Sequence, residues 1–452
     1  MTMQWERLLS LRKQGDVKER LRKNENETRL VFDVDYDRIV FSDSFRSLQD
    51  KTQVIPLSKS GFVHTRLTHS MEVSVVGRSL GRFVGNEILK KYPHLQQLGY
   101  HTNDFGTIVA SAALAHDIGN PPFGHSGEKA LGDFFKYKKG KEVANQLTDA
   151  QYQDLCNFEG NANGFRILTE SRTGVEGGLR LSYATLGTFI KYPKESLPVK
   201  PTLHIADKKY NIFQSEKHFF EEVATELGLI RYSQQTLRFA RHPLAFLVEA
   251  ADDICYTIID FEDGINLGWI AEEYALEYLS KLIQDSRITK ENITNKYHNL
   301  HTREDRMAYL RALSIGTLIQ DAQRVFLENE EAILQGEFHT SLLDKSIYKA
   351  QIQDIISMSV DKIYRSGQVV EKEIAGYAIL QNILDIYFTA VMNHLEGKAT
   401  SYDTLMLKTL PQRYFSQDKT LYEMLLGIVC YIASLTDTKV AELHARTIGL
   451  VS

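Results

Sequence analysis

The chain has 452 residues, of which 43% are hydrophobic and 25% are charged, the composition of an ordinary globular protein. This composition excludes intrinsic disorder, collagen and small secreted disulfide scaffolds. Lys and Arg total 53 against 58 Asp and Glu, a formal net charge of -5, so bulk charge requires neither a nucleic acid nor a membrane surface as partner. The length exceeds the roughly 250–300 residues at which single cores stop growing, which favours two packed regions.

Proline is scarce, with only 9 residues in the chain and none between Pro243 and Pro411. Because proline interrupts helices, so long a gap containing amphipathic runs favours an all-α protein. The three cysteines lie far apart, which fits a reducing compartment. The longest apolar run, residues 425–435, has about half of the roughly 20 residues that a membrane-spanning helix needs. The charged N-terminus lacks the apolar core of a signal peptide. We therefore expect a cytoplasmic protein without a membrane segment.

Apolar periodicity predicts helices over residues 70–89, 107–116, 163–171, 215–227 and 243–261. The second of these is nearly all small or apolar, so we expect it to be buried. Residues 173–206 contain four glycines and three prolines, which predicts an irregular, exposed excursion from the helical body. Long helical patterns return beyond residue 271, with the charged segment 290–306 as a break.

The strongest chemical signal is the segment AHDIGNPPFGHSGE, residues 115–128. A hydrophobic helix ends on His116 and Asp117, and a turn rich in glycine and proline then leads to His125 and Glu128. An imidazole nitrogen and a carboxylate oxygen from adjacent residues can bind one ion such as Mn²⁺, Mg²⁺, Fe²⁺ or Zn²⁺. An isolated His-Asp pair is more often structural, with the acid capping the turn and the histidine in the core.

Two further segments strengthen the metal-site interpretation. His69 stands at the start of a predicted helix, three residues after Arg66. In the helix over 243–261, Asp252, Tyr256 and Asp260 are spaced four residues apart and share one face, whereas Asp253 points about 100° away. A carboxylate on an apolar helix needs a cation, a metal or hydrogen-bond donors to offset burial. The alternative is a solvated acidic stripe.

The order His, His-Asp, Asp resembles the HD superfamily of metal-dependent phosphohydrolases, and within it the deoxyguanosinetriphosphate triphosphohydrolase family. The matching blocks are residues 35–42 (DYDRIVFS), 45–48 (FRSL), 51–54 (KTQV), 65–70 (TRLTHS), 116–128, 157–162 (NFEGNA), 191–193 (KYP) and 241–256. These blocks spread over more than half of the chain. The C-terminal third matches more loosely, chiefly at residues 432–437 (IASLTD).

The resemblance implies an N-terminal segment (1–27), an HD-type helical core (28–270) and a C-terminal helical region (271–452) that completes the substrate site or an oligomer interface. It implies hydrolysis of a deoxynucleoside triphosphate, with dGTP as the first candidate, to the deoxynucleoside and tripolyphosphate. It also implies a homo-oligomer, most often a hexamer, and single-stranded nucleic acid is a candidate effector.

The resemblance also assigns site residues. One divalent ion per subunit, Mn²⁺ or Mg²⁺ before Fe²⁺, Zn²⁺, Co²⁺ or Ni²⁺, would be held by His69, His116, Asp117 and Asp252. His125 would be the catalytic histidine, acting as acid or as base, with Glu128 beside it. The substrate-binding candidates are Gln53, Arg66, Asn120, Lys191, Tyr256 and Asp260. Arg66 offers a planar fork of donors that matches phosphate, and Lys191 is equally well a surface lysine.

Two other interpretations stay open. The chain could be another HD phosphohydrolase, such as a 5′-nucleotidase or a cyclic-nucleotide phosphodiesterase, which would release orthophosphate or pyrophosphate in place of tripolyphosphate. It could also be a non-catalytic module that binds nucleotides or single-stranded nucleic acid. A pure binding module, however, has no need of His125 and Glu128 in addition to the metal ligands.

Overall fold

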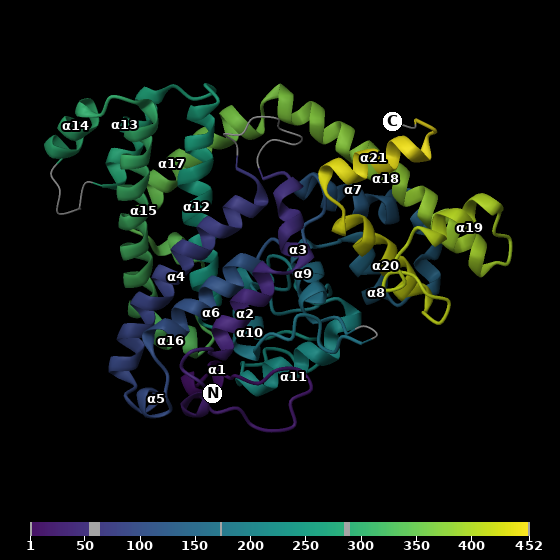
Figure 1. The fold of residues 1–452 in the computed structure, drawn as a ribbon, viewed down its shortest axis with the longest axis horizontal. Helices are drawn as coiled ribbons and strands as arrows, with labels where there is room; N and C mark the ends of the chain where they lie inside the picture. Colours follow the sequence, from purple (N-terminus) through teal and green to yellow (C-terminus); the bar gives the residue numbers. More distant parts are fainter. Residues whose placement is uncertain (1, 54–63, 172–173, 284–289, 451–452) are drawn as a thin grey trace.

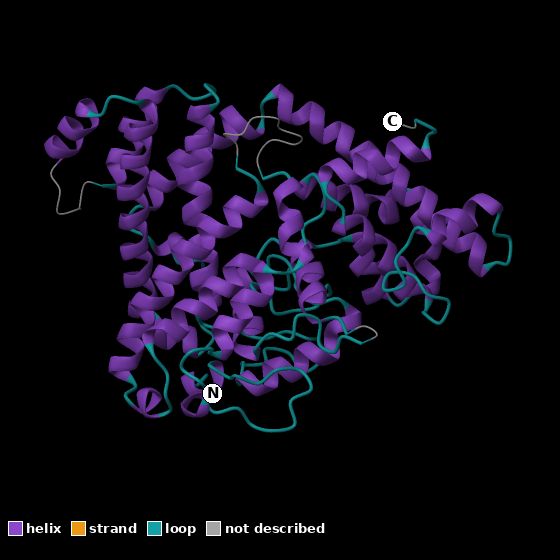
Figure 2. Ribbon diagram, viewed as in Figure 1, coloured by secondary structure: helices purple, strands orange, loops and turns teal. Residues whose placement is uncertain are grey.

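A computed structural model describes residues 2–53, 64–171, 174–283 and 290–450, and the regular secondary structure of these ranges is helical, with loops between the helices (Figures 1 and 2). The same ranges contain no strand longer than an isolated bridge, such as the pairing of Lys13 with Ser182. The predicted all-α class is therefore confirmed.

The helices of the first part of the chain carry the predicted metal ligands. They are α1 (Trp5–Leu8), α2 (Val31–Val40), α3 (Asp43–Arg46), α4 (Arg66–Lys91), α5 (His94–Gln97), α6 (Thr102–Ala115), α7 (Gly124–Tyr137), α8 (Asp149–Cys156), α9 (Gly160–Thr169), α10 (Tyr183–Phe189), α11 (Lys217–Leu227) and α12 (Ala245–Asn266).

The helices of the second part surround this group. They are α13 (Glu272–Leu282), α14 (Lys290–Asn299), α15 (Arg303–Glu328), α16 (Glu330–Leu334), α17 (Lys349–Ser359), α18 (Gly367–Leu395), α19 (Ser401–Lys408), α20 (Leu421–Ser434) and α21 (Asp437–Thr447). Short 3₁₀ segments and one π-helical turn complete the helical set: η1 (Arg22–Asn24), η2 (Ser47–Asp50), η3 (Lys139–Gln146), η4 (Ile205–Asp207), η5 (Gln214–Glu216), η6 (Leu343–Lys345) and the π-helical turn η7 (Val360–Tyr364).

The five helices expected from periodicity are present as α4, α6, α9, α11 and α12. The expectation of an exposed excursion over 173–206 is wrong for its central part: residues 181–196 are buried throughout, and α10 lies within them, packed against α6 and α11, whereas residues 198–203 are exposed as expected. Residue 173 itself lies outside the described residues, as does residue 54 of the KTQV block. The expected break at 290–306 is also wrong in extent, because α14 and α15 occupy it and leave only 300–302 outside a helix.

Two hydrophobic clusters form the interior. The first contains buried side chains of α4, α6, α12 and α15, and the second contains those of α7, α8, α18 and α20. In Figure 1 the C-terminal helices α18 to α21 lie beside α7 and α8, and α18 packs against α7 while α20 packs against α8. Each cluster thus contains side chains from before and from after residue 270. The division of the chain at that residue stays a prediction.

Among the described helices, only α18 is by itself long and apolar enough to cross a membrane, with a mean hydropathy of 1.3 over its best window. Of that window 44% is buried inside the protein, where α18 contacts α7, α20 and α21. The helices α20 and α21 meet the same criterion only as a pair bent by 116°. One part of α18 is thus covered by these helices.

Candidate active site

Three helices present the expected metal ligands to one point. Helix α4 begins at Arg66 because Thr65 and Thr68 form a reciprocal capping box, which places His69 in the first turn. Helix α6 ends at Ala115, and His116 follows directly as its C-cap residue. Helix α12 contributes Asp252 from its second turn. The long-range packing of α4 against α6 and α12 therefore creates the site.

The ligand atoms of His69, His116 and Asp252 all lie within 4.8 Å of one another. Asp252 Oδ1 is 3.2 Å from His69 Nε2 and 3.5 Å from His116 Nε2. The Nδ1 of His116 donates to the carbonyl of Ala113 at 2.7 Å, so its Nε2 presents a lone pair to the cluster. This donor set of two imidazoles and a carboxylate fits a divalent metal ion.

Asp117, the fourth expected ligand, lies at the edge of this cluster. Its Oδ1 is 3.5 Å from His116 Nε2 and also accepts from Asn120 Nδ2 at 2.6 Å. Its Oδ2 accepts from Arg66 Nη1 at 2.5 Å. Burial opposes ionisation of Asp117, but Arg66 and the two histidines outweigh it and lower the pKa of the carboxyl. Two of the predicted substrate-binding residues, Arg66 and Asn120, therefore hold a predicted metal ligand.

Lys191 also pairs with a metal ligand. Its Nζ lies 2.6 Å from Asp252 Oδ2, and the side chain is buried, so the surface-lysine alternative does not hold. Burial disfavours the charge on Asp252, yet Lys191, His116 and His69 hold its pKa well below the ordinary value. The carboxylate is thus ionised, as metal binding requires.

His125 and Glu128 form a second, adjoining pair in the first turns of α7. His125 Nδ1 lies 2.7 Å from Glu128 Oε2, and Oε1 of the same carboxylate accepts from the backbone N–H of Gly160 at 2.8 Å. Burial opposes the charge on Glu128, but the hydrogen bond with His125 and the charge of Lys209 bring its pKa down to about 2. The His125 side chain is 77% exposed and lines a pocket of about 400 Å³.

Two of the predicted substrate-binding residues, Gln53 and Asp260, present hydrogen-bond acceptors that receive no hydrogen bond within the described residues. Asp260 Oδ1 and Gln53 Oε1 are both buried and have no hydrogen-bond partner within the described part of the chain. Asp260 Oδ2 accepts from the hydroxyl of Tyr364, and burial raises the pKa of Asp260 to about 7. The ring of Tyr256 stacks on that of Tyr364, with centroids 6.0 Å apart. Unsatisfied buried acceptors of this kind suit a ligand that brings hydroxyl groups.

Sequence reasoning missed two residues here. Lys209 lies 2.9 Å from Glu159 and 3.9 Å from Glu128 Oε2, and only its place in a lysine pair, Lys208 and Lys209, sets it apart in the sequence. Tyr364 comes from the π-helical turn η7, more than 100 residues beyond Tyr256, and no local pattern marks it.

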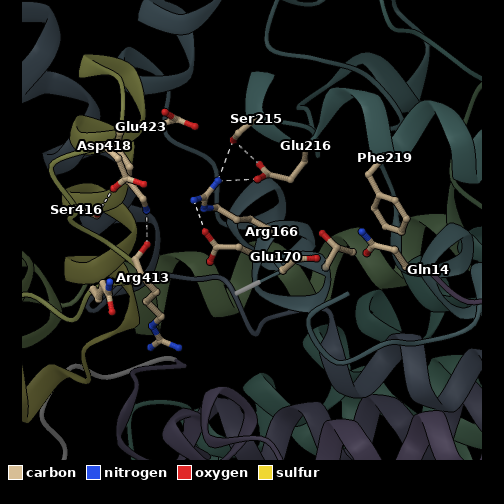
Figure 3. Close-up of a pocket in the computed structure, with 14 residues that line it drawn as sticks. Gln14, Arg166, Glu170, Ser215, Glu216, Phe219, Arg413, Ser416, Asp418 and Glu423 are labelled. Atoms are coloured by element: carbon tan, nitrogen blue, oxygen red, sulfur yellow. Dashed lines mark hydrogen bonds and ion pairs between the residues drawn. The ribbon is translucent and has the colours of Figure 1, made fainter. Parts of the chain in front are cut away.

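A separate pocket of about 610 Å³ lies between α9, α11 and the loop before α20 (Figure 3). None of the predicted site residues lines it. Its central cation, Arg166, is neutralised by Glu216 at 2.6 Å and Glu170 at 2.5 Å. Because both glutamates pair with Arg166, its charge is not free to bind an anionic substrate in this pocket.

Comparison with known proteins agrees with this geometry. The HD domain family matches residues 66–169, which include every predicted ligand and catalytic residue except Asp252. A deoxyguanosinetriphosphate triphosphohydrolase-like protein of Synechocystis sp. is 40% identical over 457 residues, covering 99% of this chain and 100% of the relative. A protein of the same name from Listeria innocua is 34% identical over 474 residues, with 99% and 100% covered. The deoxyguanosinetriphosphate triphosphohydrolase of Enterobacter sp. is 30% identical over 436 residues, with 86% and 82% covered.

An all-α fold, an HD domain and a converging His-His-Asp cluster define the class as that of HD-domain proteins, which bind divalent metal ions. Within that class, the sequence identity of 30–40% to these relatives, over most of each chain, identifies the family. The chain belongs to the deoxyguanosinetriphosphate triphosphohydrolase family.

Proposed function

We propose that this protein is a metal-dependent hydrolase of deoxynucleoside triphosphates, with dGTP as the first substrate to test. Water adds at the α-phosphorus, the bond from that phosphorus to the 5′-oxygen breaks, and the products are the deoxynucleoside and tripolyphosphate. The observation that carries the proposal is the convergence of His69, His116 and Asp252 within 4.8 Å, in a chain of this family.

His69, His116, Asp252 and Asp117 would hold one divalent ion, Mn²⁺ or Mg²⁺ before the others. Such an ion neutralises phosphate charge and lowers the pKa of bound water. The chain supplies further positive charge through Arg66. Its guanidinium passes beside Gly124, where an added Cβ would lie 2.8 Å from Nη2, so the glycine leaves room for it.

In the proposed reaction, His125 transfers a proton and Glu128 holds its imidazole. Glu128 holds Nδ1 of the imidazole, which leaves Nε2 as the atom that exchanges a proton with the reacting oxygens. The exposure of His125 gives a substrate access to this nitrogen. Lys209, at 3.9 Å from Glu128, helps to keep the carboxylate charged.

The deoxyribose is proposed to contact Gln53, Asp260 and Tyr256. The unpartnered oxygens of Gln53 and Asp260 can accept from the 3′-hydroxyl. The Tyr256 ring, held by stacking on Tyr364, would crowd a 2′-hydroxyl and so favour deoxy over ribo substrates. A Tyr256→Ala enzyme that kept full discrimination against GTP would contradict this part of the proposal.

The assembly, location and effectors are proposed from the family resemblance. We infer a cytoplasmic homo-oligomer, with a hexamer as the first state to test by light scattering. Exposed apolar side chains on α4, Met71 at 52% and Val75 at 53%, support a contact between copies. Single-stranded nucleic acid is a candidate effector, to be tested by its effect on the rate.

The deciding experiment incubates the purified full chain with each deoxynucleoside triphosphate and Mn²⁺ or Mg²⁺ and resolves the products by ion-exchange chromatography. We expect tripolyphosphate and the deoxynucleoside, and no turnover by His116→Ala. His94→Ala removes an exposed histidine of α5 and is the matched control, expected to keep full activity. Orthophosphate or pyrophosphate as the product would favour another HD phosphohydrolase, and no cleavage with either metal would refute the proposal.

A further inference from the structure

One buried carboxylate of the C-terminal segment, that of Asp437, bonds two segments that carry predicted site residues. Asp437, the first residue of α21, is 2% exposed. Its Oδ2 accepts from the backbone N–H of Thr52 at 3.1 Å and also from the Thr52 hydroxyl. Its Oδ1 accepts from the backbone N–H of Phe123 at 3.1 Å. One side chain thus joins Thr52, the neighbour of Gln53, to the turn that starts α7.

The Phe123 end of this bridge is the residue directly before α7, its N-cap. Phe123 has φ 61°, the left-handed region, which costs a residue other than glycine roughly 1–2 kcal/mol. Two contacts hold it there. Its N–H is bonded to Asp437, and its ring lies against Gly376 of α18, where an added Cβ would be 2.5 Å from the ring. His125 follows two residues later, so the direction of its side chain depends on this turn.

A second bond network joins the same two segments. Lys51 is buried, and its Nζ donates to the carbonyl of Asn120 at 2.6 Å and to the carbonyl of Ala433 at 2.7 Å. Asn120 precedes the turn at Phe123, and Ala433 stands in the last turn of α20. The corner between α20 and α21 is therefore bonded to both sides of the site.

We propose that Asp437 is a positioning residue for the hydrolytic reaction: by binding Thr52 with one oxygen and Phe123 with the other, it sets Gln53 in register with His125 and Glu128. Asp437 touches none of the atoms that the proposed reaction rearranges. The effect on the rate rests on the proposed function, whereas the bridge itself can be tested without it.

The test compares Asp437→Asn with the wild type in the full chain. The amide keeps the shape but one of the two accepting oxygens is lost, so Thr52 and Phe123 are no longer both bonded. We expect kcat to fall about 10- to 100-fold, as for a misplaced catalytic group, while the dissociation constant for Mn²⁺ stays within about two-fold. Thr438→Ala is the matched control, because its hydroxyl bonds only to Asp50 at the surface, and it should keep full activity.

Hydrogen exchange supplies a readout that does not need turnover. Amides of residues 123–128 should exchange faster in Asp437→Asn than in the wild type, and those of α4 should not. If Asp437→Asn fails to fold, Thr52→Val removes a single hydroxyl donor to the same carboxylate, and it should lower kcat by a smaller factor.

Three results would overturn the inference: a variant with wild-type kcat, unchanged exchange at 123–128, or loss of Mn²⁺ binding in step with activity, which would mark a general structural defect. A wild type that releases no tripolyphosphate would refute the proposed function alone. The exchange measurement would then still decide whether Asp437 holds the turn.

Discussion

Replacing Glu128 by glutamine tests the carboxylate behind His125. In the structure Glu128 bonds His125 Nδ1 at 2.7 Å and the N–H of Gly160 at 2.8 Å, and its pKa of about 2 keeps it charged throughout the assay range. Glutamine can keep the bond to Gly160 but loses the charge facing the imidazole. A hydrogen bond to a charged group contributes about 1.5–3 kcal/mol, and 1.36 kcal/mol is a factor of ten in rate. We therefore expect kcat to fall roughly 10- to 150-fold, with little change in KM.

The assay is the initial rate of tripolyphosphate release from dGTP at saturating Mn²⁺. Asp133→Asn is the control, because Asp133 lines the same pocket five residues after Glu128 on α7 but bonds Tyr377 and not His125. If Glu128 acts only through His125, the double variant His125→Ala/Glu128→Gln should be no slower than His125→Ala alone. The reasoning is refuted if Glu128→Gln keeps wild-type kcat or if the double variant is slower than the single one.

Three further predictions concern stability. Lys191→Met leaves Asp252 buried without its cation, so Mn²⁺ should raise Tm more in the variant than in the wild type, and an equal rise would contradict the pairing. Burial opposes the charge on His64, but Asp263 at 2.8 Å and Glu72 at 3.2 Å raise its pKa to about 10. The stability that this gives is present below the unfolded pKa of about 6.5 and is lost as pH rises through 10. The advantage of the wild type over His64→Gln in urea, measured without metal, should therefore shrink from pH 6 to pH 10, and a constant difference would exclude the ion pairs as its source. Gly376→Ala should cost about 1–3 kcal/mol by overpacking Phe123, whereas Gly316→Ala, in open space on α15, should stabilise by up to about 1 kcal/mol; equal effects would rule out the contact.

Much of the site could be predicted because each of these metal ligands lies in a local sequence pattern that marks a helix or its end. His69 follows a capping threonine, His116 ends an apolar helix, and Asp252 lies on a helix whose spacing was regular enough to choose it over Asp253. These features depend on the period of a helix and on its ends, which a sequence displays directly. The roles of the residues stay predictions until activity is measured.

Other features depend on which distant segments meet, and local patterns do not contain that information. Residues 198–203 are exposed and lie outside any helix, as the glycines and prolines of 173–206 indicate, yet residues 181–196 are buried, and α10 among them packs against α6 and α11. Arg66 and Lys191 are both substrate-binding candidates by sequence, and in the structure both are bonded to carboxylates of the site. Tyr364 and Asp437 reach the site from the C-terminal part, where the resemblance is loosest.

The path of the oxygen atom from water decides whether the proposed reaction occurs. The protein, loaded with Mn²⁺, is incubated with dGTP in oxygen-18 water, and both products are weighed by mass spectrometry. Attack at the α-phosphorus predicts one heavy oxygen in tripolyphosphate and none in deoxyguanosine. Label in deoxyguanosine, or release of orthophosphate or pyrophosphate in place of tripolyphosphate, would contradict the mechanism built on His69, His116, Asp252 and His125.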